Sequence, residues 1–306
     1  MEPALMRIEQ LIRDNATILS LPEVCLQIQL LADDPEAGVE DFARIIIQDP
    51  AFTAQLLKRV NSAYYGLPAR VATVSRAVGL IGIRELRRLS LAMAAVEVFR
   101  GQPLRGYDML TFWRHGVFTA LVAQALARRA GVLHAERLFI AGLLHDIGHL
   151  LIFTQLPETA APLSPAVLAH AEDLCERERA LLGWDHAALG GALLRFWQLP
   201  EELCVAAQYH HAPLGVVQGA RETALVALAN RIAHAVERLP GELGGAEHDP
   251  YTRFIEIEDA APVAAALTGV PAAVWQQAGV GPEAVPECLQ LAGGEFDALL
   301  QTLYGF

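Results

Sequence analysis

The feature of this sequence that most restricts its fold is the recurrence of apolar residues at three- and four-residue steps. After Pro22, the residues Val24, Ile28 and Leu31 follow this spacing, which places them on one face of a helix. No segment shows the sustained alternation of apolar and polar residues that is typical of a strand with one exposed face. The sequence therefore predicts an all-α fold.

The size and composition of the chain fit a stable helical globule. It has 306 residues, of which 53% are hydrophobic and 19% are charged. A chain of this length buries a sufficient core without the help of disulfides or a metal ion. A metal ion bound to this protein would therefore have a functional role.

Prolines and glycines divide the helical pattern into a series of expected helices. Asp49-Pro50 ends one helix and starts the next, because proline suits a first helical turn and disfavours helix in the residue before it. Beyond residue 70 the expected helices span 73–80, 83–99, 109–130, 134–146, 165–181, 186–197, 200–210, 221–237, 260–268, 271–278, 283–291 and 294–303.

The best internal boundary is a connector rich in glycine and proline at residues 101–106. Residues 1–106 are expected to form an N-terminal helical lobe. Residues 107–240 are expected to form a multi-helix bundle, and residues 241–306 a C-terminal helical appendage in which glycine and proline are frequent.

Charge is distributed unevenly along the chain. The net charge is −12, which argues against general nucleic-acid binding, since affinity for phosphate backbones comes mainly from basic surfaces. Residues 58–105 nevertheless hold nine basic and two acidic residues, a balance of +7, so the remainder of the chain is at −19. Arg76, Arg84, Arg87 and Arg88 are candidates for binding an anion or an acidic partner. The alternative is a solvated helix face or pairing within the chain.

Cysteine usage and hydropathy indicate a cytoplasmic protein. The four cysteines stand far apart, with no CxxC pair, which favours a reducing compartment. The N-terminus has charges where a signal peptide needs an apolar block. The longest uncharged run, 260–282, contains prolines, glycines and glutamines and is a weak match to a membrane span. No membrane association is expected.

Histidines are the most informative polar residues in this chain. All ten lie after position 114, and several fall at or near the ends of expected helices. Imidazole and carboxylate suit borderline divalent metals such as iron, zinc or manganese, and a helical bundle builds such a site from several helices. The alternative is that each histidine is a hydrogen-bonded core residue. The candidate metal ligands are His115, His145, Asp146, His186, His210 and His211.

The adjacent His145-Asp146 pair has a specific use. Neighbouring residues on a helix project about 100° apart. At a helix end, one of the two side chains can therefore bind one metal ion while the other bridges to a second.

Several sequence motifs resemble those of a known family. His115 followed by GLLHDIG at 142–148 resembles the HD superfamily of metal-dependent phosphohydrolases. The resemblance to its HDOD branch is closer and covers about residues 20–235. The segments that carry it are LP at 21–22, IIQDPAFTAQLLKRVNSAYYG at 46–66, AVGLIGIRELRRL at 77–89, FW at 112–113, FIAGLLHDIGHLLI at 139–152, HAALGGALLRFWQLP at 186–200 and HHAP at 210–213.

This resemblance implies an HD-like helical bundle joined to a family-specific N-terminal lobe. HDOD domains are regulatory relatives of the HD and HD-GYP phosphodiesterases, usually found in bacterial signalling, with catalytic residues often eroded. By motif position, the six candidate ligands match the metal centre of HD-GYP proteins. The resemblance thus implies one or two divalent ions, with iron as the first choice, then zinc or manganese.

Three departures from the HD-GYP pattern count against hydrolysis. The closing aspartate of the pattern falls at Asn230, and a neutral amide binds a divalent cation more weakly than a carboxylate does. The lysine expected after HDIG is His149, and no GYP segment follows His210-His211. Asn230 and His149 are therefore candidates for supporting residues around the metal, although His149 could also donate a proton to a leaving group.

These observations leave three functions open. The favoured one is a signalling module that binds metal but does not hydrolyse, and that acts on a protein partner or binds a nucleotide. The second is a metal-dependent phosphodiesterase acting on a substrate such as a cyclic dinucleotide. The third is an interaction scaffold whose histidines bind no metal.

Overall fold

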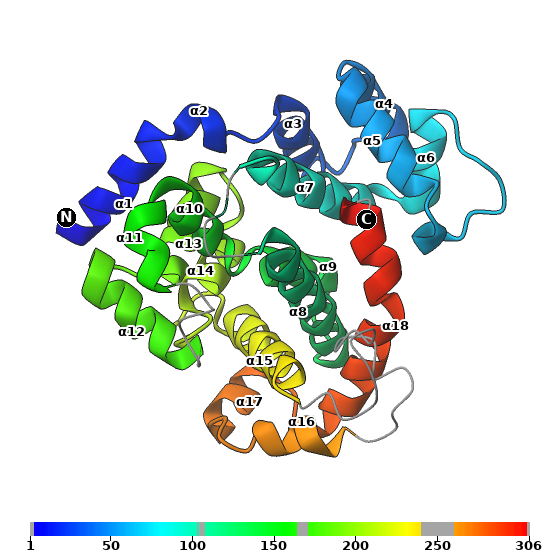
Figure 1. The fold of residues 1–306 in the computed structure, drawn as a ribbon. Coiled ribbons are helices and arrows are strands. Elements are labelled where there is room, and N and C mark those ends of the chain that lie inside the picture. The colour runs from blue at the N-terminus through cyan, green and yellow to red at the C-terminus, as the bar shows by residue number, and fades with distance from the viewer. Residues whose placement is uncertain (1–2, 103, 105–107, 164–170, 240–259, 305–306) are drawn as a thin grey trace. The chain divides into compact units, whose positions relative to one another are not determined.

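The described part of the chain is helical and contains no strand (Figure 1). The structure, a computed structural model, describes residues 3–102, 104, 108–163, 171–239 and 260–304. The all-α prediction is confirmed.

The chain divides into two compact units. Unit 1 comprises Met1–Ala16 and Gly101–Phe296, and unit 2 comprises Thr17–Arg100 and Asp297–Phe306. This division departs from the expected boundaries at both ends of the chain, because the first helix groups with unit 1 and the last turns of the final helix with unit 2. Amphipathic periodicity shows that a helix has a face to bury, but it does not show which neighbour covers that face. The expected boundaries near 106 and 240 lie outside the described residues.

Unit 1 is a bundle in which α8 packs closely against α9 and α15. Helix α8 is buried along most of its length, as expected for the central helix of a bundle. The helices of unit 1 are α1 (Pro3–Asp14), α8 (Met109–Arg129), α9 (Ala135–Leu144), α10 (Ile147–Gln155), α11 (Pro157–Ala160), α12 (Ala171–Leu182), α13 (His186–Phe196), α14 (Glu201–Tyr209), α15 (Ala220–Glu237), α16 (Ala261–Ala266), α17 (Ala272–Ala278) and most of α18 (Val285–Tyr304), with short 3₁₀ turns at Ala161–Leu163, Pro213–Gly215 and Pro282–Ala284.

Unit 2 is a smaller helical lobe in which α4 packs on α6 and α3 packs on α7. Its helices are α2 (Ala16–Leu19), α3 (Glu23–Leu31), α4 (Val39–Ile47), α5 (Pro50–Val60), η1 (Ala63–Tyr65), α6 (Val74–Ile81), α7 (Ile83–Phe99) and the end of α18. After α5, Asn61 donates to the carbonyls of Leu57 and Val71 and accepts from the Val71 amide. Asn61 therefore holds the loop that follows α5 in place.

The most apolar helical stretch belongs to the core of unit 1. Among the described residues, Ala135–Gln155 is the one stretch long and apolar enough to cross a membrane, and 83% of its most apolar window is buried within the fold. The burial explains the composition, because a helix that is buried on all sides is apolar all round.

Two expected helices near the C-terminus are in fact one. The sequence predicts helices at 283–291 and 294–303 with a break between them, but α18 runs without interruption from Val285 to Tyr304. Glycine in a helix interior costs about 1 kcal/mol relative to alanine. Burial of Leu289, Phe296 and Leu299 along one face of α18 offsets that cost, since each buried large side chain contributes about 1.5–3 kcal/mol.

A helix that the sequence does not predict follows the His-Asp pair. The expected helix 134–146 ends at Leu144, and α10 begins at Ile147. The intervening residues His145 and Asp146 form a turn, with Asp146 at φ −99° and ψ 9°. The apolar run through this region hides the break, because both helices are buried.

Candidate metal centre

The turn between α9 and α10 places His145 and Asp146 deep in unit 1. Gly142, in the last turn of α9, lies against α8, and a Cβ atom there would come within 2.8 Å of the Cα of Ala120. Only glycine permits so close an approach of the two backbones. As a result, the Nε2 atom of His145 lies 3.3 Å from the Nε2 atom of His115 on α8.

A second glycine brings α10 onto the start of α13. A Cβ atom on Gly148 would overlap the carbonyl oxygen of His186, the first residue of α13. The absence of a side chain at Gly148 therefore allows His186 to approach Asp146 from the side opposite His115.

Around the Oδ2 atom of Asp146 lie ligand-type atoms from α8 and the end of α9. The Nε2 atoms of His145 and His115 are 3.3 Å and 3.6 Å from Oδ2. The side-chain oxygen of Asn230, on α15, lies 3.1 Å from His115 Nε2. We call His115, His145, Asp146 and Asn230 group A.

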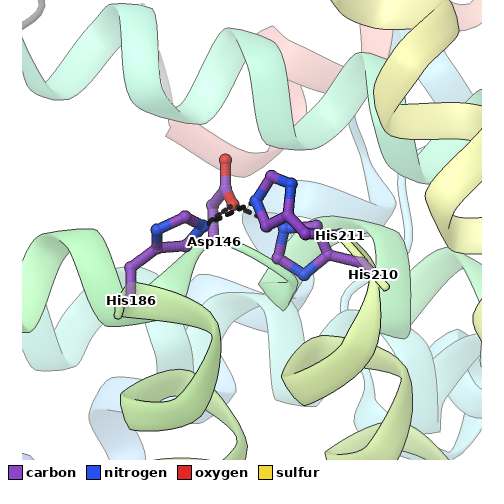
Figure 2. Close-up of side chains that lie close together, drawn as sticks. All are labelled: Asp146, His186, His210 and His211. Atoms are coloured by element: carbon purple, nitrogen blue, oxygen red, sulfur yellow. Dashed lines mark hydrogen bonds and ion pairs between the residues drawn. The ribbon is translucent and has the colours of Figure 1, made fainter. Parts of the chain in front are cut away.

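Around the Oδ1 atom of Asp146 lie imidazoles from α13 and from the end of α14. The Nε2 atoms of His186 and His210 are each 3.3 Å from Oδ1, and His211 Nε2 lies 3.0 Å from His186 Nε2. Figure 2 shows these three rings turned towards the Asp146 carboxylate. We call Asp146, His186, His210 and His211 group B. The structure thus brings all six candidate ligands together, with one oxygen of Asp146 facing each group.

The outer nitrogen of four of these imidazoles is already engaged. His145 Nδ1 donates to the carbonyl of Gly142 and His210 Nδ1 to that of Ala207, each at 2.7 Å. His115 Nδ1 and His186 Nδ1 lie 2.7 Å from carboxylate oxygens of Glu237 and Glu178. Such bonds fix the tautomer and aim the lone pair of Nε2 inwards.

Inward lone pairs around a carboxylate repel one another unless protons or metal ions lie between them. The buried Oδ1 of Asp146 and Nε2 of His210 have no hydrogen-bond partner. Metal–ligand bonds of about 2.1 Å separate neighbouring ligands by roughly 3.0 Å in an octahedron and 3.4 Å in a tetrahedron. The separations of 3.0–3.6 Å within groups A and B fit these values.

Burial and neighbouring charges divide the histidines into two kinds. Burial lowers the pKa of His115, but Glu237, Asp146 and Asn230 together outweigh burial and raise that pKa to about 9. In the same way, Glu178 raises the pKa of His186. Burial lowers the pKa of His210 to about 4 and also lowers the pKa of His211. His210 and His211 are therefore neutral at pH 7, which is the form that binds metal.

The sequence analysis missed one carboxylate that supports group B. Glu178, on α12, is fully buried; one of its oxygens lies 2.7 Å from His186 Nδ1 and the other 3.2 Å from His149 Nδ1. The His149 ring stacks on that of His186, with the ring centres 3.7 Å apart. The two histidines lower the pKa of Glu178 more than burial raises it. His149 therefore lies behind His186, not facing Asp146.

Two further residues that the sequence analysis missed support group A. The ring of His234 stacks on that of His115, with centres 4.6 Å apart, and its Nδ1 lies 2.9 Å from Glu237. His234 and Glu237 follow Asn230 on α15 by four and seven residues. Residues at these spacings lie on the same face of a helix. That spacing is a signal that could have identified them.

The four candidate arginines lie in unit 2 and fall into two classes. Arg87 donates to Gln29 and Asp33, and the buried Arg88 donates to Glu85 and Tyr64. Arg76 and Arg84 are exposed. The alternative of pairing within the chain thus describes Arg87 and Arg88.

Comparison with known proteins gives one family match and several similar structures. The HDOD domain model matches residues 18–213. An uncharacterized protein of Treponema pallidum is 30% identical over 196 residues, which is 63% of this chain but 37% of that protein. The chain therefore spans well under two thirds of this curated relative.

Two crystal structures resemble this chain over nearly its whole length. A protein of Shewanella amazonensis, provisionally described as a phosphohydrolase, is 26% identical with a TM-score of 0.71 and coverage of 96% of this chain and 97% of that one. An HDOD domain protein of unknown function from Geobacter sulfurreducens is 24% identical with a TM-score of 0.73 and coverage of 99% and 100%. With the family model spanning most of the chain, this protein belongs to the HDOD domain family.

Proposed function

We propose that this protein is a bacterial signalling module that binds divalent transition metal ions at groups A and B and does not hydrolyse phosphoesters. The observation that supports it best is the position of Asp146, whose two oxygens each face one set of inward imidazole nitrogens. A bridging carboxylate between two sets of ligands suits a pair of metal ions. Iron is the first candidate, followed by zinc and manganese.

The distribution of the ligands over several helices explains how metal binding would act as a signal. They come from α8, the α9–α10 turn, α13, the end of α14 and α15. Because binding requires all these helices in one arrangement, the free energy of binding favours that arrangement over others. A protein partner that contacts any of these helices would then sense occupancy.

Three features argue against hydrolysis. Asn230 supplies a neutral oxygen where the hydrolytic pattern has a carboxylate. His149, the candidate proton donor, is buried and faces Glu178. In addition, His115, His145, His186 and His210 are each no more than 6% exposed, so a substrate has little access to the ligands.

A metal-dependent phosphodiesterase is the second candidate, with a cyclic dinucleotide as substrate. It is favoured by the same bridging carboxylate, since paired metal ions can activate a water molecule and hold phosphate oxygens. The provisional description of the Shewanella protein as a phosphohydrolase also supports this second candidate function.

Turnover measurements separate the two functions. Protein loaded with iron, zinc or manganese is incubated with cyclic dinucleotides and simple phosphoesters, beside a His145→Ala control. The signalling function expects bound metal with no turnover above that of the control. Turnover that His145→Ala abolishes would establish the enzyme instead. If the protein binds no metal, the remaining function is that of an interaction scaffold whose histidines bind no metal.

The other parts of the proposal concern location and partners. The composition of the chain favours a cytoplasmic protein, and its negative charge disfavours nucleic acid. A signalling protein is the proposed partner, and a nucleotide is the alternative ligand.

A further inference from the structure

A small cavity in unit 2 has a positively charged lining. Its volume is about 230 Å³, and its charged lining residues are Lys58 and Arg59 on α5 and Glu97 and Arg100 at the end of α7. Thr302 and Tyr304, at the end of α18, also line it. All these residues belong to unit 2, whereas groups A and B belong to unit 1.

Arg59 is the unusual member of this lining. It is 7% exposed, and its two terminal nitrogens donate to the carbonyls of Gln55 and Leu303. Its Nε atom is buried without a hydrogen-bond partner, and no carboxylate among the described residues forms an ion pair with it. A buried guanidinium without a counter-ion is strongly unfavourable.

The rim of the cavity adds more positive charge. Lys58 and Arg100 are exposed, and Glu97, the one carboxylate among the described lining residues, lies 2.7 Å from Arg100. Three cations and one carboxylate leave a surplus of +2. Burial lowers the pKa of Arg59 and the charge of Arg100 lowers it further, while Glu97 and Tyr304 raise it.

We propose that this cavity binds a compact oxyanion, namely a phosphate group. A phosphate dianion matches the surplus of +2, and arginine binds phosphate through directional hydrogen bonds. A volume of about 230 Å³ is below the roughly 300–1,000 Å³ of pockets for drug-sized ligands. The ligand is therefore inorganic phosphate or the phosphate of a small phosphomonoester, and not a dinucleotide.

A purely structural role for Arg59 explains only part of these observations. The bond to the carbonyl of Leu303 ties α5 to the last turn of α18. It does not explain the two further cations on the rim. A bound anion accounts for them.

Calorimetric titration with inorganic phosphate, at constant ionic strength in chloride, tests the proposal. Lys58→Gln/Arg100→Gln removes the two exposed cations and is expected to weaken binding about tenfold or more. The matched control is Arg44→Gln/Arg70→Gln, which removes two exposed arginines of the same unit that do not line the cavity. It is expected to bind phosphate as the wild type does.

Phosphate could also bind to metal ions at groups A and B, so Asp146→Asn is titrated in parallel. The proposal expects that variant to retain phosphate binding. Binding lost only in Asp146→Asn, binding lost equally in both double variants, or no binding by the wild type at millimolar phosphate would each overturn it.

A second measurement does not depend on the double variants. Phosphate is expected to raise the thermal unfolding midpoint of the wild type above that in chloride of equal ionic strength. Arg59→Lys keeps the charge but loses the planar guanidinium group, so this gain is expected to shrink while circular dichroism shows a folded protein. An equal gain in wild type and Arg59→Lys would contradict a site built on Arg59.

Discussion

At the scale of single residues, Asp146 and the bonds behind its neighbours determine what the centre can bind. In four of the five histidines of groups A and B, the inward-facing imidazole nitrogen is aimed by a bond on the other side of the ring. Carboxylates that support ligands in this way raise ligand basicity and fix the ring orientation. The residues behind the ligands are therefore expected to affect metal affinity as measurably as the ligands themselves.

Glu178→Gln tests this support for group B. The amide keeps the size of the side chain but not the charge that orients His186, so the affinity for a metal ion at group B is expected to fall about 10- to 100-fold. Titration against a competing chelator measures the loss. Glu176→Gln, an exposed change on the same helix, is the control and should leave affinity unchanged. Equal affinities in both variants would contradict the role of Glu178.

Asn230→Asp tests whether the amide limits group A. The new carboxylate would face His115 at the position where Asn230 Oδ1 now lies 3.1 Å away. Because a carboxylate binds divalent cations more tightly than an amide, affinity at group A is expected to rise about tenfold. The same chelator competition reports it. An unchanged affinity would show that Asn230 does not reach the metal.

The sequence predicts part of this centre for identifiable reasons. The paired residues His145-Asp146 and His210-His211 stand out because polar side chains are rare in apolar runs. Glu178 does not stand out, because it lies in the highly charged segment ERERALL, where one buried carboxylate looks like a solvated one. His234 and Glu237 carry only a helical spacing from Asn230, which becomes informative once Asn230 is considered a ligand.

At the scale of elements, glycines set how closely the ligand-bearing helices approach. Gly148→Ala would press a methyl group against the backbone of α13 at His186. Overpacking of this kind costs about 1–3 kcal/mol or more, and it would also move His186 away from Asp146. The free energy of unfolding, measured by denaturant titration, and the metal content are both expected to fall.

Gly79→Ala is the matched control for that substitution. Gly79 lies in α6, and a Cβ atom there would meet no atom within 4 Å. Alanine in a helix is favoured over glycine by about 0.5–1 kcal/mol, so stability should rise slightly. A Gly148→Ala protein as stable as the wild type and with full metal content would refute the close approach of α10 and α13.

The helices themselves follow from periodicity, but some of their ends do not. The expected helix 109–130 is observed as Met109–Arg129, because Asp108 caps its start and accepts from the Thr111 amide. The turn at His145-Asp146 and the continuity of α18 through Gly293-Gly294 depend on tertiary packing. Local propensity therefore could not reveal them.

At the scale of the whole molecule, metal binding is expected to stabilise one unit and not the other. Every residue of groups A and B lies in unit 1. Chelation should therefore increase amide hydrogen exchange in α8, α9, α13, α14 and α15, while α3 to α7 of unit 2 keep their protection. A ligand present at 100 times its dissociation constant contributes about 2.7 kcal/mol.

Thermal unfolding in chelator and in added metal complements the exchange measurement. A lower midpoint in chelator, restored by iron, zinc or manganese, is expected. Equal loss of protection in both units would contradict a centre confined to unit 1.

The grouping of α1 with unit 1 and of the end of α18 with unit 2 was not predictable from sequence, because it depends on contacts between distant segments.

The most direct test of the metal centre is element-resolved X-ray scattering from crystals of protein purified without chelator. The account expects anomalous signal from a transition metal beside Asp146, within bonding distance of the Nε2 atoms of His186 and His210, and a second signal near His115 and His145. Crystals in which these rings surround no such signal, although metal is supplied in excess, would contradict it.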